Sequence, residues 1–473
     1  MARTDQAQLS FADLEFHQQG IALDPVLQTI ANFLDQHQEI INRVRADLFR
    51  GLKHPTRGRQ GLSPSQVLRS LVLMRIKNWD LRELSQRIAD GYTLRRFTDF
   101  RGDEPVPKHD AFSRAFNHLT SQTLKAINDF VVQTAVKLGL EDGTKLRVDS
   151  TVVQTDIHHP TDNTLLWDVV RVLTRLVHRL YKKLGQKVRG FCNRTRAARR
   201  RMQQIQRMTP KQRQTRQTKK YRELIEITQE VVKAARAVLH RTRRAHSPDL
   251  LTDAAIRDLR QQIEHFCQLG ERVLDQTYRR VLQREQVPAS EKVYSIFETH
   301  TDMIKRGKIE TPVEFGHKVF LAESAQGLVT QYEVLEGNPP DEQHVRPSLE
   351  QHCKTFGDAP KIYSGDRGFH SPENVNQCHQ AGVEQECIPQ RGGQKTPERE
   401  IYESSRDFRK GQRFRAGIEG RISVMMRGRG MKRCQAEGRS HFKLFVAAAV
   451  LANNLLRIAD LIRKPRSRRK SAA

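Results

Sequence analysis

The sequence is poor in the residues that mark secreted, zinc-ribbon and membrane proteins. Only six of its 473 residues are cysteines, and no two of them form a Cys-x-x-Cys pair. This scarcity excludes a disulfide framework and a zinc ribbon, and it fits a reducing cytoplasm. No uninterrupted apolar run approaches the roughly 18–20 residues of a membrane-spanning helix. No apolar stretch follows the first residues, MARTDQ. We therefore expect neither contact with a membrane nor a secretory signal.

Acidic residues are also in deficit. Lys and Arg number 82 against 54 Asp and Glu, which gives a net charge of +28, while 37% hydrophobic residues still suffice for a packed core. So large an excess disfavours an enzyme that acts on small molecules alone and favours a polyanionic partner. Nucleic acid is the first expectation. The predicted location is therefore the cytoplasm, in association with the nucleoid.

Residues 1–140 are expected to form a helical domain. Apolar residues recur at helical spacing from Pro25 to about Arg50, and Ser63-Pro64 has the form of a helix N-cap followed by proline. Two more short helices are expected around residues 81–88 and 111–119. Short helices in a basic setting are typical of a DNA-binding helix-turn-helix-like domain, although a plain helical bundle fits the pattern as well.

A long helical insertion is expected over residues 157–290, after a first core strand within 141–156. Three apolar stripes with helical spacing frame a basic run at residues 194–201, which includes Arg199, Arg200 and Arg201. Such a run is often only a solvated helix face. Its single sign and length favour a surface for the phosphate backbone. Trp167 fits core packing better than stacking on a displaced base.

The rest of the core is expected over residues 291–462, followed by a disordered basic tail at 463–473. The predicted strands span 293–297, 313–321, 328–335, 361–364 and 383–388. Helices are predicted at 341–356, from Ser371, and around 414–427 and 441–462, whereas the segment between Ile388 and Glu419 is expected to be short and mostly loop. Without the insertion, an antiparallel meander leads into alternating helices and strands. This order predicts an α/β fold with a mixed sheet and flanking helices, of the ribonuclease H kind.

Three acids from separate segments are candidates for phosphoryl-transfer chemistry, which uses pairs of divalent ions held by carboxylates. Asp149 lies within the first strand, Asp366 follows the fourth between two glycines, and Glu419 lies on a late helix. Each also has a simple structural explanation. Asp149 could face solvent, Asp366 could cap a turn, and Glu419 could pair with Arg415 four residues earlier. Their joint placement favours a common site.

Several segments around these acids carry a family resemblance. The chain resembles bacterial insertion-sequence transposases of the DDE type, most closely the group of not-yet-classified insertion sequences (ISNCY). Residues 61–119 resemble the helical domain found ahead of such cores. The other matching segments are RVDSTV (147–152), EFGHKV (314–319), GNP (337–339), GDRGF (365–369), FRAGIEG (414–420), MKRC (431–434) and NNLL (453–456).

The resemblance implies a ribonuclease H-like catalytic core in which Asp149, Asp366 and Glu419 are both the catalytic acids and the metal ligands. It implies two Mg²⁺ ions, which Mn²⁺ can replace, and phosphodiester cleavage and strand transfer at the ends of an insertion sequence. The partners would be double-stranded DNA, both terminal inverted repeats and target, and further copies of the chain in a dimer or larger synaptic complex. The predicted DNA-binding residues are Arg415, Arg427, Lys318, Arg199, Arg200 and Arg201.

The sequence departs from this family around the last acid. Related transposases carry a Tyr-x2-Arg-x3-Glu-x6-Lys pattern, in which the tyrosine position here is Gln412 and the lysine position is Met426. Arg427 is rotated roughly 80° from Glu419 at 100° per residue, so only its length could let it replace the lysine. The insertion also follows the first acid, whereas several relatives have theirs just before the last.

These departures keep other functions open. A catalytically silent DNA-binding protein derived from a transposase would explain the missing tyrosine and lysine. A nuclease on the same core would use the same three acids without strand transfer. An RNA-associated basic helical protein would explain the charge and the insertion but not the placement of the acids.

Overall fold

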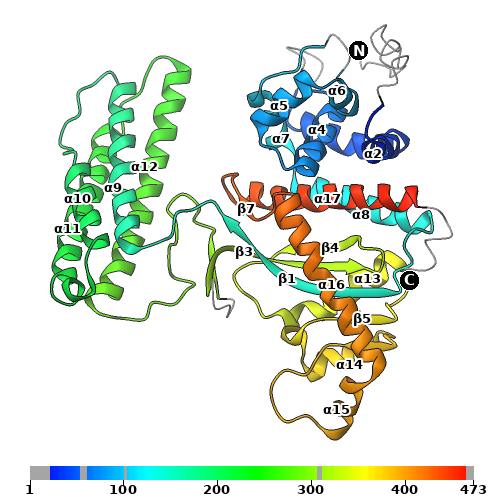
Figure 1. Cartoon of the computed structure of the whole chain (residues 1–473). Helices are drawn as coiled ribbons and strands as arrows, with labels where there is room; N and C mark the ends of the chain where they lie inside the picture. The colour runs from blue at the N-terminus through cyan, green and yellow to red at the C-terminus, as the bar shows by residue number, and fades with distance from the viewer. Residues whose placement is uncertain (1–21, 54–60, 101–103, 306–311, 465–473) are drawn as a thin grey trace. The chain divides into compact units, whose positions relative to one another are not determined.

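The structure is a computed structural model, which describes residues 22–53, 61–100, 104–305 and 312–464. The chain divides into two compact units (Figure 1). Unit 1 comprises residues 1–154 and 316–473, and unit 2 comprises residues 155–315. Almost all of the predicted tail, from residue 465 onward, lies outside the described residues.

The N-terminal part of unit 1 is helical, as predicted. Its helices are α2 (Pro25–Gln36), α3 (Gln38–Phe49), α4 (Pro64–Lys77), α5 (Leu81–Asp90), α6 (Tyr92–Phe97), α7 (His109–His118) and α8 (Ser121–Lys137). The single helix expected from Pro25 to Arg50 is two helices, because His37 leaves the helical region with φ −120° and ψ 71°. Ser63 caps α4 in a reciprocal capping box with Gln66, which confirms that predicted start.

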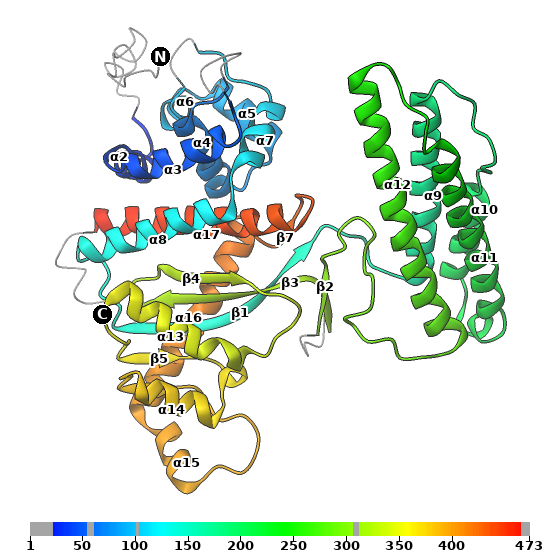
Figure 2. The same cartoon turned by 180° about the vertical axis from the view of Figure 1, so that it is seen from behind.

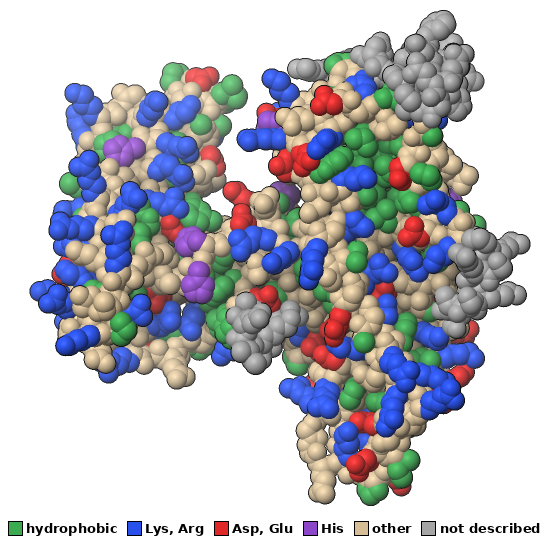
Figure 3. Space-filling model, viewed as in Figure 1, with side chains coloured by type: hydrophobic (Ala, Val, Ile, Leu, Met, Phe, Trp, Pro, Cys, Tyr) green, Lys and Arg blue, Asp and Glu red, His purple; other side chains and the backbone are tan. Residues whose placement is uncertain are grey.

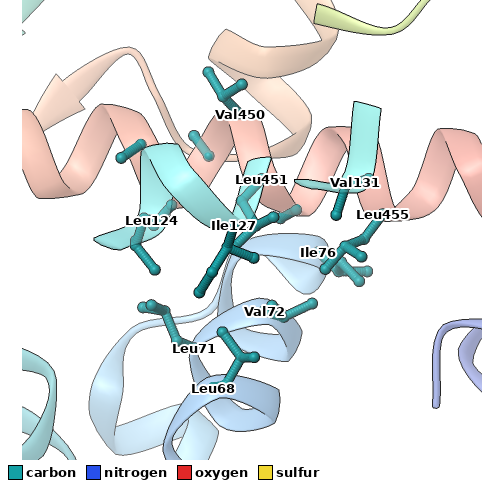
Figure 4. Close-up of a cluster of buried hydrophobic side chains, with 14 of the residues drawn as sticks. Leu68, Leu71, Val72, Ile76, Leu124, Ile127, Val131, Val450, Leu451 and Leu455 are labelled. Atoms are coloured by element: carbon teal, nitrogen blue, oxygen red, sulfur yellow. The ribbon is translucent and has the colours of Figure 1, made fainter. Parts of the chain in front are cut away.

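The core of unit 1 surrounds α17 (Arg439–Arg463). Figure 4 shows Leu451 of this helix beside Ile127 of α8, and Leu455 near Val131 of α8 and Ile76 of α4, in one apolar cluster. By length and composition α17 could cross a membrane, although the sequence shows no uninterrupted apolar run of that length. However, 72% of its most apolar window is buried inside the protein. We therefore assign it as the central helix of a packed core.

Asn454, in the NNLL segment of α17, joins this helix to the sheet. The side chain of Asn454 is fully buried, accepts a hydrogen bond from Val329 N at 2.9 Å and donates one to Val329 O at 2.8 Å. It also donates to Asn128 on α8 at 2.8 Å. A buried amide with all of these bonds made fixes the position of α17 against both neighbours.

The sheet is mixed, which confirms the α/β class. Its strands are β1 (Lys145–Thr155), β2 (Asp302–Lys305), β3 (Val313–Ser324), β4 (Val329–Val334), β5 (Ile362–Ser364), β6 (Gln385–Cys387) and β7 (Arg433–Cys434). The order is β2-β3-β1-β5-β6, with β4 paired to β3 and β7 to β1. β1 is antiparallel to β3 and parallel to β5, and Asp149 lies opposite Leu321 of β3.

Helices cover both faces of this sheet. The helices that follow β4 are α13 (Val345–Phe356), α14 (Pro372–Gln380), α15 (Pro397–Ser404) and α16 (Arg406–Gly428), and α8 and α17 pack against β4. Helix α16 crosses one face and α13 lies on the other, as Figures 1 and 2 show from opposite sides. The segment from Ile388 to Glu419 is thus largely helical, contrary to the prediction. Thr396 and Ser405 supply the two N-caps that start α15 and α16.

Unit 2 is helical over most of its length. It contains α9 (Asp162–Lys183), α10 (Thr195–Gln206), α11 (Pro210–Thr242) and α12 (Leu250–Thr277), and its apolar stripes form one core against which Trp167 packs. The strand predicted at 293–297 is wrong. Val293 N bonds to the side chain of Gln276, and the Ser295 hydroxyl accepts from Phe297 N, so side chains satisfy this backbone in place of a neighbouring strand.

Candidate active site

The three predicted acids meet around one guanidinium in unit 1. Nη2 of Arg415 lies 3.1 Å from Oδ2 of Asp149 and 3.7 Å from Oδ2 of Asp366. Nη1 of the same side chain lies 2.8 Å from Oε1 of Glu419. Because both aspartate oxygens contact one nitrogen, their separation cannot exceed the sum of these two distances. The structure therefore brings the predicted acids and Arg415 together.

Strand pairing explains the approach of the two aspartates. β1 and β5 are parallel neighbours, with Arg147 opposite Ser364, so Asp149 lies just beyond the end of β5 along β1. Asp366 follows β5 by two residues, and its carboxylate accepts a hydrogen bond from Gly368 N at 2.8 Å. Residues at the carboxyl ends of parallel strands commonly share one edge of the sheet.

A buried ion-pair network holds α16 against the sheet. Glu323 on β3 is fully buried and contacts Arg147 of β1 at 2.7 Å and Arg421 of α16 at 2.8 Å. Arg147 also donates to Phe414 O at 2.6 Å. The helix approaches so closely that a Cβ atom on Gly417 would collide with the Arg147 guanidinium. These contacts set the part of α16 that carries Arg415 and Glu419 beside the two aspartates.

Gln412, at the tyrosine position of the pattern that the sequence resembles, adds a second link. Its Nε2 donates to Gly365 O at 3.2 Å and to Cys387 O at 2.5 Å, so it joins α16 to the ends of β5 and β6. Met426, at the lysine position, packs against the core of unit 1. Arg427 is exposed on the same helix. The structure does not bring Arg427 into the ion pairs around Arg415.

A fourth acid, Asp341, belongs to the same cluster and was missed by the sequence interpretation. It accepts a hydrogen bond from the Ser150 hydroxyl at 2.6 Å, beside Asp149, and lies close to Gly368, beside Asp366. Its Oδ1 also contacts Lys318 Nζ at 2.9 Å. The only signal in the sequence was that Asp341 follows the GNP segment and a predicted strand. That position alone does not distinguish a site residue from an ordinary acidic residue of a loop.

Lys318, predicted to bind DNA, is turned inward. Besides Asp341, it contacts Pro339 O at 2.9 Å, and its side chain is 11% exposed. This ammonium offsets part of the negative charge of the four acids.

The carboxyl group of Asp149 is electrostatically strained. Burial raises its pKa from 3.8 to about 6; Arg415 opposes this rise, whereas Asp366 and Asp341 add to it. Desolvation and like charges both disfavour the ionised form of a carboxylic acid. Such a perturbed acid among other acids is typical of functional sites, although structural networks shift pKa values as well.

The residues present fit a divalent cation in donor chemistry. Asp149 and Asp366 direct oxygens at one point, where a cationic nitrogen of Arg415 lies, and hard ions such as Mg²⁺ prefer carboxylate oxygens. Among the described residues, however, no three His, Cys, Asp or Glu side chains stand at the mutual spacing of a metal site. A divalent ion at these acids would therefore have to take oxygens that Arg415 now contacts.

The predicted phosphate-binding arginines of the insertion differ in their surroundings. Arg199 and Arg200 are exposed on α10 of unit 2. Arg201, in contrast, forms an ion pair with Glu223 of α11. On the visible face of unit 1, Lys and Arg side chains gather over α15 and α16 (Figure 3). Exposed cations there include Arg409 and Arg413 on α16, the helix that carries Arg415.

The comparisons with known proteins concern the N-terminal helices. Residues 21–118 match the family model described as Transposase domain (DUF772). No curated protein and no solved structure matched the chain. The matched range covers α2 to α7 and stops before the strand that carries Asp149. The N-terminal region is therefore similar to a transposase domain, which supports a transposase family for the chain.

Proposed function

We propose that the protein is a DDE-type insertion-sequence transposase of the ISNCY-like group, with a ribonuclease H-like catalytic core. The observation that carries the proposal is the meeting of Asp149, Asp366 and Glu419 around Arg415 in a chain whose N-terminal region matches the transposase-domain model. The strand order supports it too, because an antiparallel β4-β3-β1 meander is followed by the parallel pair β5 and β6. A fold of this class alone would not assign a function.

In the proposed mechanism, Asp149, Asp366 and Glu419 hold two Mg²⁺ ions beside a phosphodiester. When bound, such ions supply charge neutralisation for the attacking and leaving oxygens of an in-line displacement. The residues of the chain have separate parts in this arrangement. Asp149 must be ionised to act as a ligand, and Arg415 supplies a planar cation that can hold a phosphate through two parallel hydrogen bonds. Ser150 and Lys318 hold Asp341 beside the cluster.

The DNA-binding surfaces follow from the charge distribution. We assign recognition of the terminal inverted repeats to the N-terminal helices, and contact with flanking DNA to the exposed arginines of unit 2. Transposition joins two DNA ends to one target, so the working form would be a dimer or a larger synaptic complex. Its place would be the nucleoid, in the cytoplasm.

Cleavage and joining of DNA from the flanks of the gene test the proposal. Purified protein, labelled flank duplexes, a target plasmid and Mg²⁺ should yield joined products. Asp149→Asn, Asp366→Asn and Glu419→Gln should each abolish cleavage and leave duplex binding in place. Asp407→Asn is the matched control, since Asp407 is an exposed acid on the same helix and forms an ion pair with Lys410 rather than with Arg415.

The products also separate the rival functions. Cuts without joined product would indicate a nuclease. Duplex binding with neither cuts nor joining would indicate a silent DNA-binding protein. Cleavage by Asp149→Asn at the rate of the parent would refute the assignment of the acids.

A further inference from the structure

Arg415 makes three ion pairs with one guanidinium, and all three partners are proposed metal ligands. Its side chain is 17% exposed, whereas that of Glu419 is 65% exposed. Asp149, the most buried partner at 13% exposure, has its pKa lowered by Arg415 against the effects of burial and the other acids. The guanidinium therefore supplies the positive charge that offsets these three carboxylates, as Lys318 does for Asp341.

The same guanidinium has unused capacity for hydrogen bonding. Its Nε is buried and has no hydrogen-bond partner within the described part of the chain. A buried donor without a partner is costly, so a ligand that satisfies it gains affinity. The planar fork of arginine suits the two oxygens of a phosphate group. A phosphodiester can thus give the Arg415 guanidinium two parallel hydrogen bonds in place of some of its contacts with the acids.

We propose that Arg415 is a positioning residue that competes with divalent metal for Asp149, Asp366 and Glu419 and is drawn away by a DNA phosphate. This inference rests on the proposed function and extends it, because it couples metal binding to DNA binding. The guanidinium and the metal ion would contact the same carboxylate oxygens, so the presence of one weakens the binding of the other. When Arg415 contacts a phosphate, those oxygens become free for the metal.

Linkage makes the proposal quantitative. If DNA raises the affinity for metal by some factor, metal must raise the affinity for DNA by the same factor. Couplings between binding sites commonly lie between about 5-fold and 150-fold. Such coupling would favour metal binding, and therefore strand cleavage, in chains that already hold DNA.

The first measurement is the affinity of the full-length chain for Mn²⁺ without DNA, from the electron paramagnetic resonance signal of free Mn²⁺. Arg415→Gln should bind Mn²⁺ at least about 5-fold more tightly than the parent. Arg409→Gln is the matched control, because Arg409 is an exposed arginine of α16 and should change the affinity far less. Arg415→Lys keeps the charge but not the fork, so its affinity should fall between the parent and Arg415→Gln.

The second measurement repeats the titration with a 40-base-pair duplex from the flank of the gene, at about equal concentrations of duplex and chain. The duplex should raise the Mn²⁺ affinity of the parent and leave that of Arg415→Gln nearly unchanged. A titration of the duplex alone measures the Mn²⁺ that binds to the DNA itself, and this amount is subtracted.

The outcomes separate this inference from the proposed function. Equal or weaker Mn²⁺ binding by Arg415→Gln, or an equal effect of DNA on both chains, would overturn the competition. Asp149→Asn identifies the site in each titration. If Mn²⁺ binding is unchanged by Asp149→Asn, the metal does not bind at these acids, and the proposed function fails together with the inference.

Discussion

Replacement of Asp149 by asparagine should make unit 1 more stable. The folded chain holds this carboxyl at a pKa of about 6 against 3.8 for an unburied aspartic acid, a rise of about two units. One unit corresponds to about 1.4 kcal/mol, so the ionised form costs the folded state up to about 3 kcal/mol. A neutral amide of the same shape removes that cost, although it gives Arg415 a weaker partner. We expect a gain of about 1–3 kcal/mol at pH 7.5.

The gain should depend on pH in a defined direction. Between pH 4 and pH 6, roughly, the folded parent binds more protons than the unfolded parent, so the stability of the parent falls as the pH rises through this window. Below the unfolded pKa of 3.8, Asp149 is neutral in both states. The free energy of unfolding of Asp149→Asn should therefore exceed that of the parent above about pH 6. The difference should disappear towards pH 4.

Urea unfolding followed by tryptophan fluorescence can measure this gain in unit 1 alone. The chain contains two tryptophans, Trp79 in unit 1 and Trp167 in unit 2. In a Trp167→Phe background, Trp79 reports on unit 1, and a shift of the midpoint at constant slope gives the change in stability. A lower midpoint for Asp149→Asn at pH 7.5, or a gain that persists at pH 4, would refute the argument.

Other predictions concern packing and DNA contact. Glu323→Ala should destabilise unit 1 by about 3–5 kcal/mol in the same assay, because two guanidinium groups lose their buried partner; a loss below 1 kcal/mol, roughly the value of an exposed pair, would show that the network is not structural. Gly417→Ala should lower the unfolding midpoint, because the new Cβ atom would collide with the Arg147 side chain. Gly420 on the same helix has open space around it, so Gly420→Ala should raise the free energy of unfolding by about 0.5–1 kcal/mol. Equal effects would contradict the close approach of α16. In salt titrations of duplex binding, Arg200→Gln should reduce the slope by about 0.9, and Arg201→Gln, which already pairs with Glu223, should reduce it less.

Much of the fold was predictable because its signals are local. The N-cap at Ser63, the hairpin of β3 and β4 and the strand that carries Asp149 follow from caps, turns and β-branched residues, and the structure confirms each. One failure has a cause outside the segment itself. The strand expected at 293–297 has the right composition, but no described strand pairs with it, and side chains bond its backbone instead.

The candidate site was predictable only in part. The positions of Asp149, Asp366 and Glu419 along the chain suggested a common site, and Arg415 stood one helical turn before Glu419. Nothing in the sequence indicated that this arginine would contact all three acids. Asp341 was equally hidden, since its membership depends on Ser150 and Gly368, which come near it only in the folded sheet. Contacts between distant segments carry no local pattern.

The central claim is that Asp149, Asp366 and Glu419 together bind the metal ions of phosphodiester chemistry. Anomalous scattering from Mn²⁺ in crystals of the chain with flank DNA tests it most directly. We predict peaks within coordination distance of all three carboxylates, at about 2.0–2.6 Å from their oxygens, with Arg415 on a DNA phosphate. Manganese peaks bound elsewhere, with the three acids still on Arg415 in a complex that cleaves DNA, would contradict the account.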